Sequence, residues 1–316
     1  MLDDNNVLDQ FYVRDHLNEY MAAVDLVLKL PAAALVKPSQ AKITKLIWVG
    51  EDGCSNLDFI KLWLDQAKTT LKIPVLLVDN LKTAWLDKNT LVVLKPSWHN
   101  TEKFNTLYKI ATKSAQVVSP ASLTDNWLWQ PLNLLKQRKV VSQAEYSRLV
   151  SSLDSARQWA AKQYSPDVSV SKNLAKQLAL FAVGKTAVFT STHEQLVLSN
   201  RFVENLRIDA RNLAFSEELF AQMDRLKWGW SSHPVDKPYA TFVVKYNYSL
   251  AEKNLLKERS RQLSGLLPAS QEVNVKAETL IEAALKADAL AYYMATYLAV
   301  LNKRSLKPHK YDSDDY

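Results

Sequence analysis

Short apolar segments alternate with amphipathic helical segments along most of the chain, and this alternation is the strongest constraint on its fold. The apolar segments are rich in valine, leucine and isoleucine, whereas the segments between them carry apolar residues at helical spacing. Apolar strands that alternate with helices build parallel sheets whose two faces are covered by helices. We therefore predict an α/β protein. Its expected strands lie at 45–50, 73–79, 90–95, 115–120, 185–192, 239–247 and 272–276.

The alternation occurs in two runs, which predict two doubly wound parallel-sheet lobes. A helical arm at 3–29 precedes the first run, and the two runs divide near residue 160. We expect one domain at 1–160, formed by the arm and the first lobe, and a second domain at 161–316. A length of 316 residues fits two domains of ordinary size. The second run closes with a long apolar helix.

Composition excludes several classes of protein. The net charge is +7, but its lysines are scattered among acidic residues rather than clustered with aromatic ones, so we expect no nucleic-acid partner. No segment approaches the roughly 18 apolar residues of a membrane span, and the acidic first residues do not resemble a signal peptide. The single cysteine, Cys54, fits a reducing compartment. A cytoplasmic protein without a membrane partner is expected.

Ligands of doubly wound sheets bind beyond the carboxyl ends of the strands. Three loops therefore supply the candidate substrate-binding residues. These residues are Gly50, Gly53, Cys54 and Ser55 after the first strand, Ser97, His99, Asn100 and Thr101 after the third, and Ser191 and Thr192 after the fifth. Their hydroxyl and backbone N–H groups could bind phosphate oxygens at helix N-termini, or the hydroxyls could serve as helix caps.

The first of these loops is a glycine turn between a strand and a helix. The whole chain has five glycines, and two of them, Gly50 and Gly53, stand in KLIWVGEDGCS. Such a turn can cradle phosphate, but Glu51 and Asp52 oppose an anion. The spacing is neither GxGxxG nor GxxxxGKS, so a dinucleotide or a nucleoside triphosphate is not expected, and we predict no cofactor.

The sequence gives little support for a metal site or for a catalytic nucleophile. The five histidines form no metal-spaced pair and Cys54 has no sulfur partner, so no metal site is expected. No GxSxG elbow is present. Cys54 precedes a helix, which lowers a thiol pKa, but it has no evident base and lies beside two acids. We interpret it as an inert thiol.

The order of these segments resembles two sugar isomerase (SIS) domains, and the chain is similar to the bifunctional phosphoglucose/phosphomannose isomerase family over most of its length. KLIWVGEDGCS is similar to that family's Gly-Met-Gly-Gly-Ser loop, and LVVLKPSWHNTEKF to its Ser-Tyr-Ser-Gly-Asn-Thr-Glu segment. SPASL, NRFVENLRIDARNLAF, FAQMDRLKWGW and TYLAVLN resemble further segments in the same order. The resemblance implies a phosphosugar ligand and a homodimer.

The chain departs from the family at its functional positions. Gly50, Gly53, Asn100, Thr101 and Glu102 match the family. The departures are Asp52 for a glycine, Cys54 for a serine, Pro96 and Trp98 for phosphate-contacting serines, His99 for a glycine, Pro120 for the active-site arginine, Ile208 for the catalytic glutamate and Asp224 for the catalytic histidine. Trp98 could stack on a sugar ring or fill the emptied phosphate pocket.

These departures weaken the chemistry that the resemblance implies. An aldose–ketose isomerase needs a base near the migrating proton and a cation or dipole near the enediolate. Isoleucine at 208 accepts no proton, and proline at 120 offers no bidentate partner for an anion. Asp224 could act as an acid or base, and Asp209 could replace the missing base if the helix ended with a shifted turn. Asp224 and Asp209 are therefore the candidate catalytic residues.

Three functions follow. The chain could be an active phosphosugar isomerase, a catalytically weakened member that still binds a phosphosugar, or a non-catalytic SIS scaffold that binds other proteins. Asn100, Thr101 and the Gly50 turn favour the first two. Ile208 and Pro120, together with the acidic glycine loop, favour the third.

Overall fold

The computed structural model describes residues 1–29, 42–49, 62–63, 73–78, 80–94, 101–118, 133, 135–218, 239–263 and 270–306. The chain divides into two compact units. The central unit is Ala23–Ser151, and the terminal unit combines Met1–Ala22 with Ser152–Tyr316.

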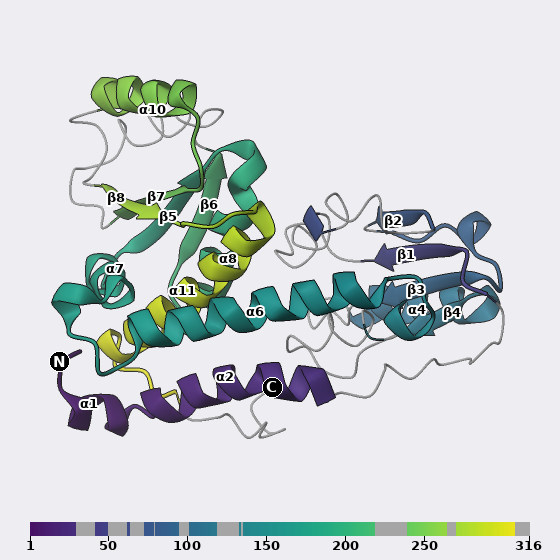
Figure 1. Ribbon diagram of the computed structural model, residues 1–316, viewed down its shortest axis with the longest axis horizontal. Coiled ribbons are helices and arrows are strands. Elements are labelled where there is room, and N and C mark those ends of the chain that lie inside the picture. The colour runs from purple at the N-terminus through teal and green to yellow at the C-terminus, as the bar shows by residue number, and fades with distance from the viewer. Residues whose placement is uncertain are drawn as a thin grey trace. The chain divides into compact units, whose positions relative to one another are not determined.

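A four-stranded parallel sheet forms the centre of the central unit (Figure 1). Its strand order is β2-β1-β3-β4. The strands are β1 (Lys45–Val49), β2 (Val75–Val78), β3 (Thr90–Leu94) and β4 (Gln116–Val118), and the helix α4 (Thr101–Ser114) connects β3 to β4. The four expected strands of the first lobe are confirmed.

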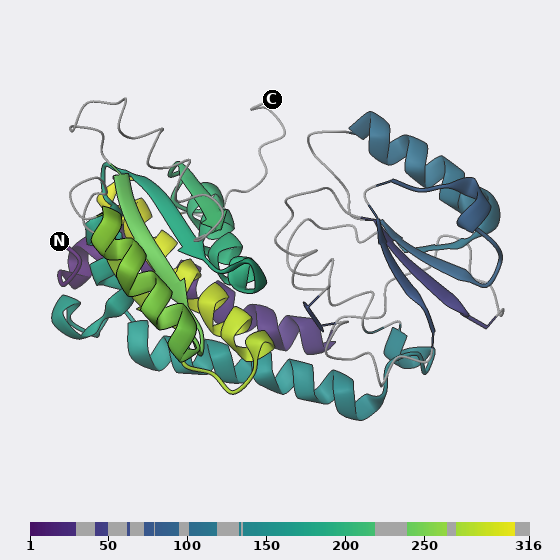
Figure 2. The ribbon, with the colours of Figure 1, turned by 90° about the horizontal axis from the view of Figure 1, so that it is seen from above.

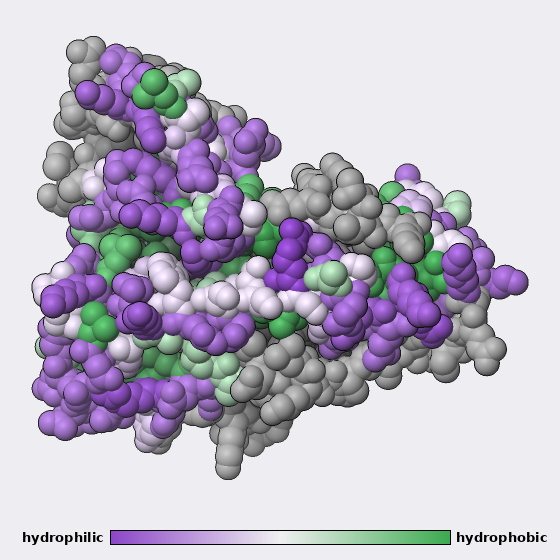
Figure 3. Space-filling model, in the orientation of Figure 1, coloured by the Kyte–Doolittle hydropathy of each residue, from purple (hydrophilic) through white to green (hydrophobic). Residues whose placement is uncertain are grey.

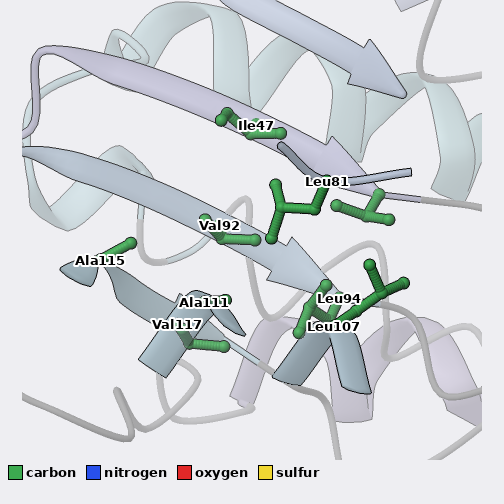
Figure 4. Packing of buried hydrophobic residues seen from close by; sticks show 9 residues of the cluster. Ile47, Leu81, Val92, Leu94, Leu107, Ala111, Ala115 and Val117 are labelled. Atoms are coloured by element: carbon green, nitrogen blue, oxygen red, sulfur yellow. The ribbon is translucent and has the colours of Figure 1, made fainter. Parts of the chain in front are cut away.

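The core of this sheet is aliphatic (Figure 4). Leu107 and Ala111 of α4 are buried against apolar residues of the sheet, in one cluster with Ile47 and Val92. Leu81 joins the same cluster. Alternate residues of β1 and β3 thus supply the face that α4 covers, as expected for strands buried on both faces.

The terminal unit contains the second parallel sheet, in the order β6-β5-β7-β8. Its strands are β5 (Thr186–Ser191), β6 (Ala214–Glu218), β7 (Tyr239–Lys245) and β8 (Ser270–Asn274). Its helices are α6 (Gln143–Tyr164, which begins in the central unit), α7 (Leu174–Ala182), α8 (Leu196–Ile208), α10 (Leu250–Leu263) and α11 (Leu280–Leu301). Figures 1 and 2 show α10 on the opposite side of this sheet from α11. The α/β fold with two doubly wound parallel sheets is confirmed.

Stacked aromatic rings fill the core of the second sheet. Phe189 stacks on Phe202 at 4.9 Å and on Phe242 at 4.6 Å between ring centroids. The apolar helix α11 packs against α7 and α8. Gly184 lies just beyond the C-cap of α7 with φ +69°, which glycine adopts without strain.

The N-terminal arm consists of two helices, α1 (Asn5–Gln10) and α2 (Val13–Lys29), rather than one. The break falls at Phe11 and Tyr12, where Tyr12 has φ +60°. Residues 1–22 belong to the terminal unit, in which Arg14 pairs with Asp167 at 2.7 Å. This grouping differs from the expected domain division at residue 160, because the start of the arm joins the second half of the chain.

Strand β6 was not predicted from the sequence, because its second half is polar. Within the described residues, short 3-10 helices also occur at Thr83–Trp85, Val170–Lys172 and His193–Gln195. The helices expected at 56–68 and 125–141 lie largely outside the described residues. Figure 3 shows hydrophilic side chains over most of the described surface in that view, with apolar ones in small groups.

Candidate functional site

Most of the predicted site lies outside the described residues. This group comprises Gly50, Gly53, Cys54, Ser55, Ser97, His99, Asn100 and Asp224, together with Trp98 and Pro120. The strands that lead into the two loops are described. Val49 at the end of β1 and Leu94 at the end of β3 are register partners in neighbouring strands. The glycine loop and the serine loop therefore start from adjacent points of the sheet edge.

Thr101 is the first residue of α4, the helix that follows the serine loop. Beside the first turns of α4, the surface forms a hollow of about 460 Å³. Its lining residues are Asn80, Glu102, Lys103, Thr106, Leu107 and Ile110. Four of these lining residues are polar or charged and two are apolar, of which Leu107 is 7% exposed. Such a mixture suits a small polar molecule with one apolar face.

At the carboxyl edge of the second sheet, Ser191 is already engaged within the protein. It is the last residue of β5 and is fully buried. The hydroxyl of Ser199 in α8 donates a hydrogen bond to the Ser191 hydroxyl over 2.9 Å. Ser191 therefore ties the strand to the helix that follows it.

Gln195, near the end of β5, is hydrogen-bonded to the backbone beyond the neighbouring strand β7. Its side-chain amide donates to the backbone oxygen of Tyr246 over 2.7 Å and accepts from the Tyr246 backbone N–H over 2.9 Å. Tyr246 follows directly after β7, the strand beside β5. This double hydrogen bond spans the neighbouring ends of two parallel strands, where a ligand of a doubly wound sheet would enter.

Thr192 and His193 complete the edge. Thr192 is 7% exposed, and its Oγ1 has no hydrogen-bond partner among the described residues. Burial raises the pKa of the neighbouring Tyr248 to about 12, although a backbone hydrogen bond from Thr192 opposes the rise. His193 is exposed and lies 3.3 Å from Glu218 of β6. The edge thus contains one buried hydroxyl with spare hydrogen-bonding capacity.

Ile208 and Asp209 lie at the end of α8, where the resemblance predicts the position of the family's catalytic glutamate. Ile208 is the last residue of the helix and is 65% exposed. Asp209 is the C-cap residue with helical backbone angles, and its N–H donates to the Asn205 carbonyl over 2.9 Å. The helix therefore continues regularly to this point, without the shifted turn that would carry Asp209 into the position of Ile208.

The sequence analysis missed a buried ionic cluster in the same unit. Asp288 of α11 accepts hydrogen bonds from Arg201 and Asn205 of α8 and from the Tyr20 hydroxyl of α2. Arg157 of α6 donates to the Tyr20 carbonyl over 2.6 Å. The signal in the sequence was a single aspartate within an otherwise apolar stretch of the helix that ends the fold. The cluster connects α2, α6, α8 and α11.

The described residues contain no group of three or more histidine, cysteine, aspartate or glutamate side chains that could hold a metal ion. Among the same residues, no helix combines the length and the apolar character needed to cross a membrane.

Comparison with known proteins finds a family match for part of the terminal unit. Residues 171–311 match the bacterial phospho-glucose isomerase C-terminal SIS domain. Comparison with curated proteins gives no match.

Solved structures are similar over nearly the whole chain. A glucose-6-phosphate isomerase like protein from Thermus thermophilus is 16% identical, with a TM-score of 0.60, and the match covers 96% of this chain and 94% of that one. A putative phosphosugar isomerase from Clostridium difficile 630 is 12% identical, with a TM-score of 0.56 and coverage of 97% and 96%. The C-terminal domain of glucosamine-fructose-6-phosphate aminotransferase from Francisella tularensis is 13% identical, with a TM-score of 0.55 and coverage of 92% and 96%.

At these identities the solved structures establish the fold, while the family match rests on the sequence of residues 171–311. Residues 171–311 therefore form a domain similar to the bacterial phospho-glucose isomerase C-terminal SIS domain, and the chain as a whole has the fold of the solved structures that it matches.

Proposed function

We propose that this protein binds a phosphosugar but has lost effective isomerase activity. The observation that carries this proposal is Ile208, a 65% exposed isoleucine at the position that corresponds to the family's catalytic glutamate. Isomerisation requires a base within about 3 Å of the proton that moves between adjacent carbons. An alkyl side chain cannot take that proton.

The neighbouring acids do not restore the base. Asp209 caps the helix in regular geometry. Asp224 replaces a histidine, and a carboxylate cannot provide the positive charge of an imidazolium beside an enediolate. Pro120 replaces the arginine that would hold anionic oxygens. Each such loss removes orders of magnitude in rate, so Asp209 and Asp224 remain candidates only for residual activity.

We assign ligand binding to the central unit. Its candidate residues are Gly50, Gly53, Cys54, Ser55, Ser97, His99, Asn100 and Thr101. Two adjacent strand ends lead into these loops, and a hollow lies beside the first turns of α4. The second sheet edge is less suited to a ligand, because Ser191 and Gln195 are already bonded within the protein. Thr192 stays a candidate binding residue, because its hydroxyl has no hydrogen-bond partner among the described residues.

A second candidate function is a non-catalytic scaffold that binds no sugar. The internal hydrogen bonds of the second sheet edge favour it, since they stabilise the fold without a ligand. For either function we propose a cytoplasmic homodimer, as the resemblance to the isomerase family implies.

A thermal-shift and calorimetric titration with fructose, glucose and mannose 6-phosphates tests the proposal. A ligand that binds the folded state raises the melting temperature. Thr101→Val should abolish the shift. Thr112→Val is the matched control in the same helix, because among the described residues the Thr112 hydroxyl bonds to the backbone oxygens of Tyr108 and Lys109 in the preceding turn. A shift for the wild type and Thr112→Val, without turnover, supports the proposal. The absence of any shift at millimolar sugar supports the scaffold, and rapid turnover contradicts both.

A further inference from the structure

The net charge of the chain comes from its central unit alone. Ala23–Ser151 contains 17 lysine and arginine residues and 10 aspartate and glutamate residues, which gives a net charge of +7. The terminal unit contains 23 residues of each kind, so its net charge is zero. Such an imbalance creates a positive potential around one unit and attracts negatively charged partners to it.

Several lysines of the central unit meet at the amino edge of its sheet, although they are far apart in the sequence. Lys42 and Lys45 lie at the start of β1, Lys88 precedes β3, and Lys113 lies at the end of α4, just before β4. These three strands are neighbours and parallel, so they begin at the same edge of the sheet (Figure 1). Since adjacent strands are about 4.8 Å apart, the fold gathers cations that are scattered along the sequence.

Hydrogen bonds join the backbone segments of this edge. The Thr44 N–H donates to the Asn89 carbonyl over 2.9 Å, which connects the start of β1 to the segment before β3. The side-chain amide of Gln116 donates to the Lys88 carbonyl over 3.0 Å, which connects the start of β4 to the same segment. The lysines of this edge therefore extend from segments that are held to one another.

Four of these lysines, which we call the amino-edge patch, have exposed side chains and no ion pair among the described residues: Lys42, Lys88, Lys109 and Lys113. Lys109 and Lys113 are four residues apart in α4 and therefore lie on one face of the helix. The strand starts are about 5 to 10 Å apart, which is comparable with the Debye length of about 8 Å at physiological ionic strength. The potentials of the four charges therefore overlap.

The acid of the same edge does not neutralise the patch. Within the described starts of β1, β3 and β4 and the last turn of α4, Asp87 is the only acidic residue. It pairs with Lys45 over 3.5 Å and accepts hydrogen bonds from the Asn89 N–H and the Thr90 hydroxyl. The negative end of the α4 dipole offsets part of the charge of Lys113, whereas the other three lysines keep theirs.

The surroundings of the patch favour an acidic protein over a nucleic acid or a membrane. Surfaces that bind nucleic acids combine cations with accessible aromatic rings, but the nearby rings of Trp85 and Tyr108 pack against the apolar cluster of the sheet. Surfaces that bind membranes add apolar side chains that enter the lipid. Among the described residues of the central unit, Leu76 is the only exposed large apolar one, at 37%. Lysine is a flexible point charge, which suits carboxylates in variable positions.

We propose that the amino-edge patch binds an acidic segment of another protein, in which several aspartate or glutamate residues are clustered. This inference does not rest on sugar binding, because the candidate ligand loops follow the opposite, carboxyl ends of the same strands. Opposite charges steer the two proteins together and raise the rate of association, an effect that weakens with salt.

Fluorescence anisotropy of a labelled peptide with about eight clustered aspartate and glutamate residues, titrated with the full chain, tests this surface. The double variant Lys109→Gln with Lys113→Gln should raise the dissociation constant about three- to tenfold, as the loss of two exposed charge pairs does. Lys253→Gln with Lys257→Gln is the matched control, because these exposed lysines are also four residues apart, on α10 of the neutral terminal unit. Circular dichroism verifies that each variant is folded.

A second double variant keeps the test independent of the stability of α4. Lys42→Gln with Lys88→Gln, at two strand starts, should weaken binding by a similar factor. An increase in salt from about 50 mM to about 300 mM should weaken binding to the wild type at least about tenfold. A peptide with asparagine and glutamine in place of the acids should not bind.

Three results would overturn the proposal. The first is no binding of the acidic peptide at about 100 μM protein in low salt. The second is equal weakening by the α10 control variant and by the two patch variants. The third is tighter binding of a single-stranded oligonucleotide, or of vesicles that contain phosphatidylserine, than of the peptide at the same ionic strength. Each of these results leaves the sugar titration unaffected, so the two proposals fail separately.

Discussion

Arg201 binds one carboxylate oxygen of Asp288 with two hydrogen bonds, from Nε over 2.9 Å and from Nη2 over 2.6 Å. The two side chains are only 12% and 15% exposed. Burial alone would raise the pKa of Asp288, but the charge and hydrogen bonds of Arg201 outweigh that effect and hold the pKa below its usual value. The pair joins α8 to α11, and the ionised state of Asp288 depends on it.

Removal of one partner of this pair should destabilise the fold strongly. Arg201→Met leaves Asp288 as a buried charge that keeps the hydrogen bonds of Asn205 and Tyr20 and the weaker influence of the Arg157 charge. This should cost about 3 kcal/mol of unfolding free energy. The double variant Arg201→Met with Asp288→Leu should recover most of that loss, because no buried charge remains. Urea denaturation measures both. A loss below about 1 kcal/mol for the single variant would contradict this account.

Asp3 should stabilise the terminal unit more than a typical surface acid. It accepts a hydrogen bond from the fully buried ammonium group of Lys176 over 3.1 Å and another from the Val170 N–H over 2.9 Å. Asp3→Ala leaves both donors short of a partner and should cost about 1–3 kcal/mol. Asp9→Ala on the same arm is the control, since its exposed pair with Arg14 should contribute less than about 1 kcal/mol. Equal losses for the two variants, in chemical denaturation, would refute the prediction.

His16 should make the protein sensitive to acid. Its ring stacks on Tyr292 at 5.0 Å, and burial lowers its pKa from 6.5 to about 4. The unfolded chain therefore binds the proton more readily, and stability should fall as the pH decreases from about 6.5 to about 4. His16→Phe keeps an aromatic ring without the titration, so the difference in unfolding free energy between wild type and variant should change by up to about 3 kcal/mol across that window. A difference that does not vary with pH would show that His16 titrates normally.

Much of the fold follows from sequence patterns. The helix expected at 142–163 is α6 at Gln143–Tyr164, and the strand expected at 185–192 is β5 at Thr186–Ser191. These segments have strong periodicity and clear ends. Strand β6 lacks that signal, because only one of its faces is buried and its last residues are acidic. The break in the arm depends on the left-handed backbone of Tyr12, and a tyrosine at this position gave no reason to expect that conformation.

The site was harder to predict because a hydroxyl at a strand end has more than one use. Ser191 suits a phosphate oxygen as well as it suits Ser199, and only the packing of α8 on β5 decides between them. Gln195 was not singled out, since its role depends on the backbone of Tyr246, 51 residues away. Ile208 was singled out from the resemblance, and its replacement of the family's base stays a prediction; the structure shows it exposed at the end of α8.

Exchange of solvent deuterium into fructose 6-phosphate, followed by proton NMR, tests the loss of isomerase chemistry most directly. Removal of the migrating proton by a base is detected even when the full reaction does not complete. We predict no incorporation above the protein-free rate at micromolar protein, in the wild type or in Asp224→Ala. Incorporation that scales with protein concentration and disappears in Asp224→Ala would contradict the account and identify an active isomerase.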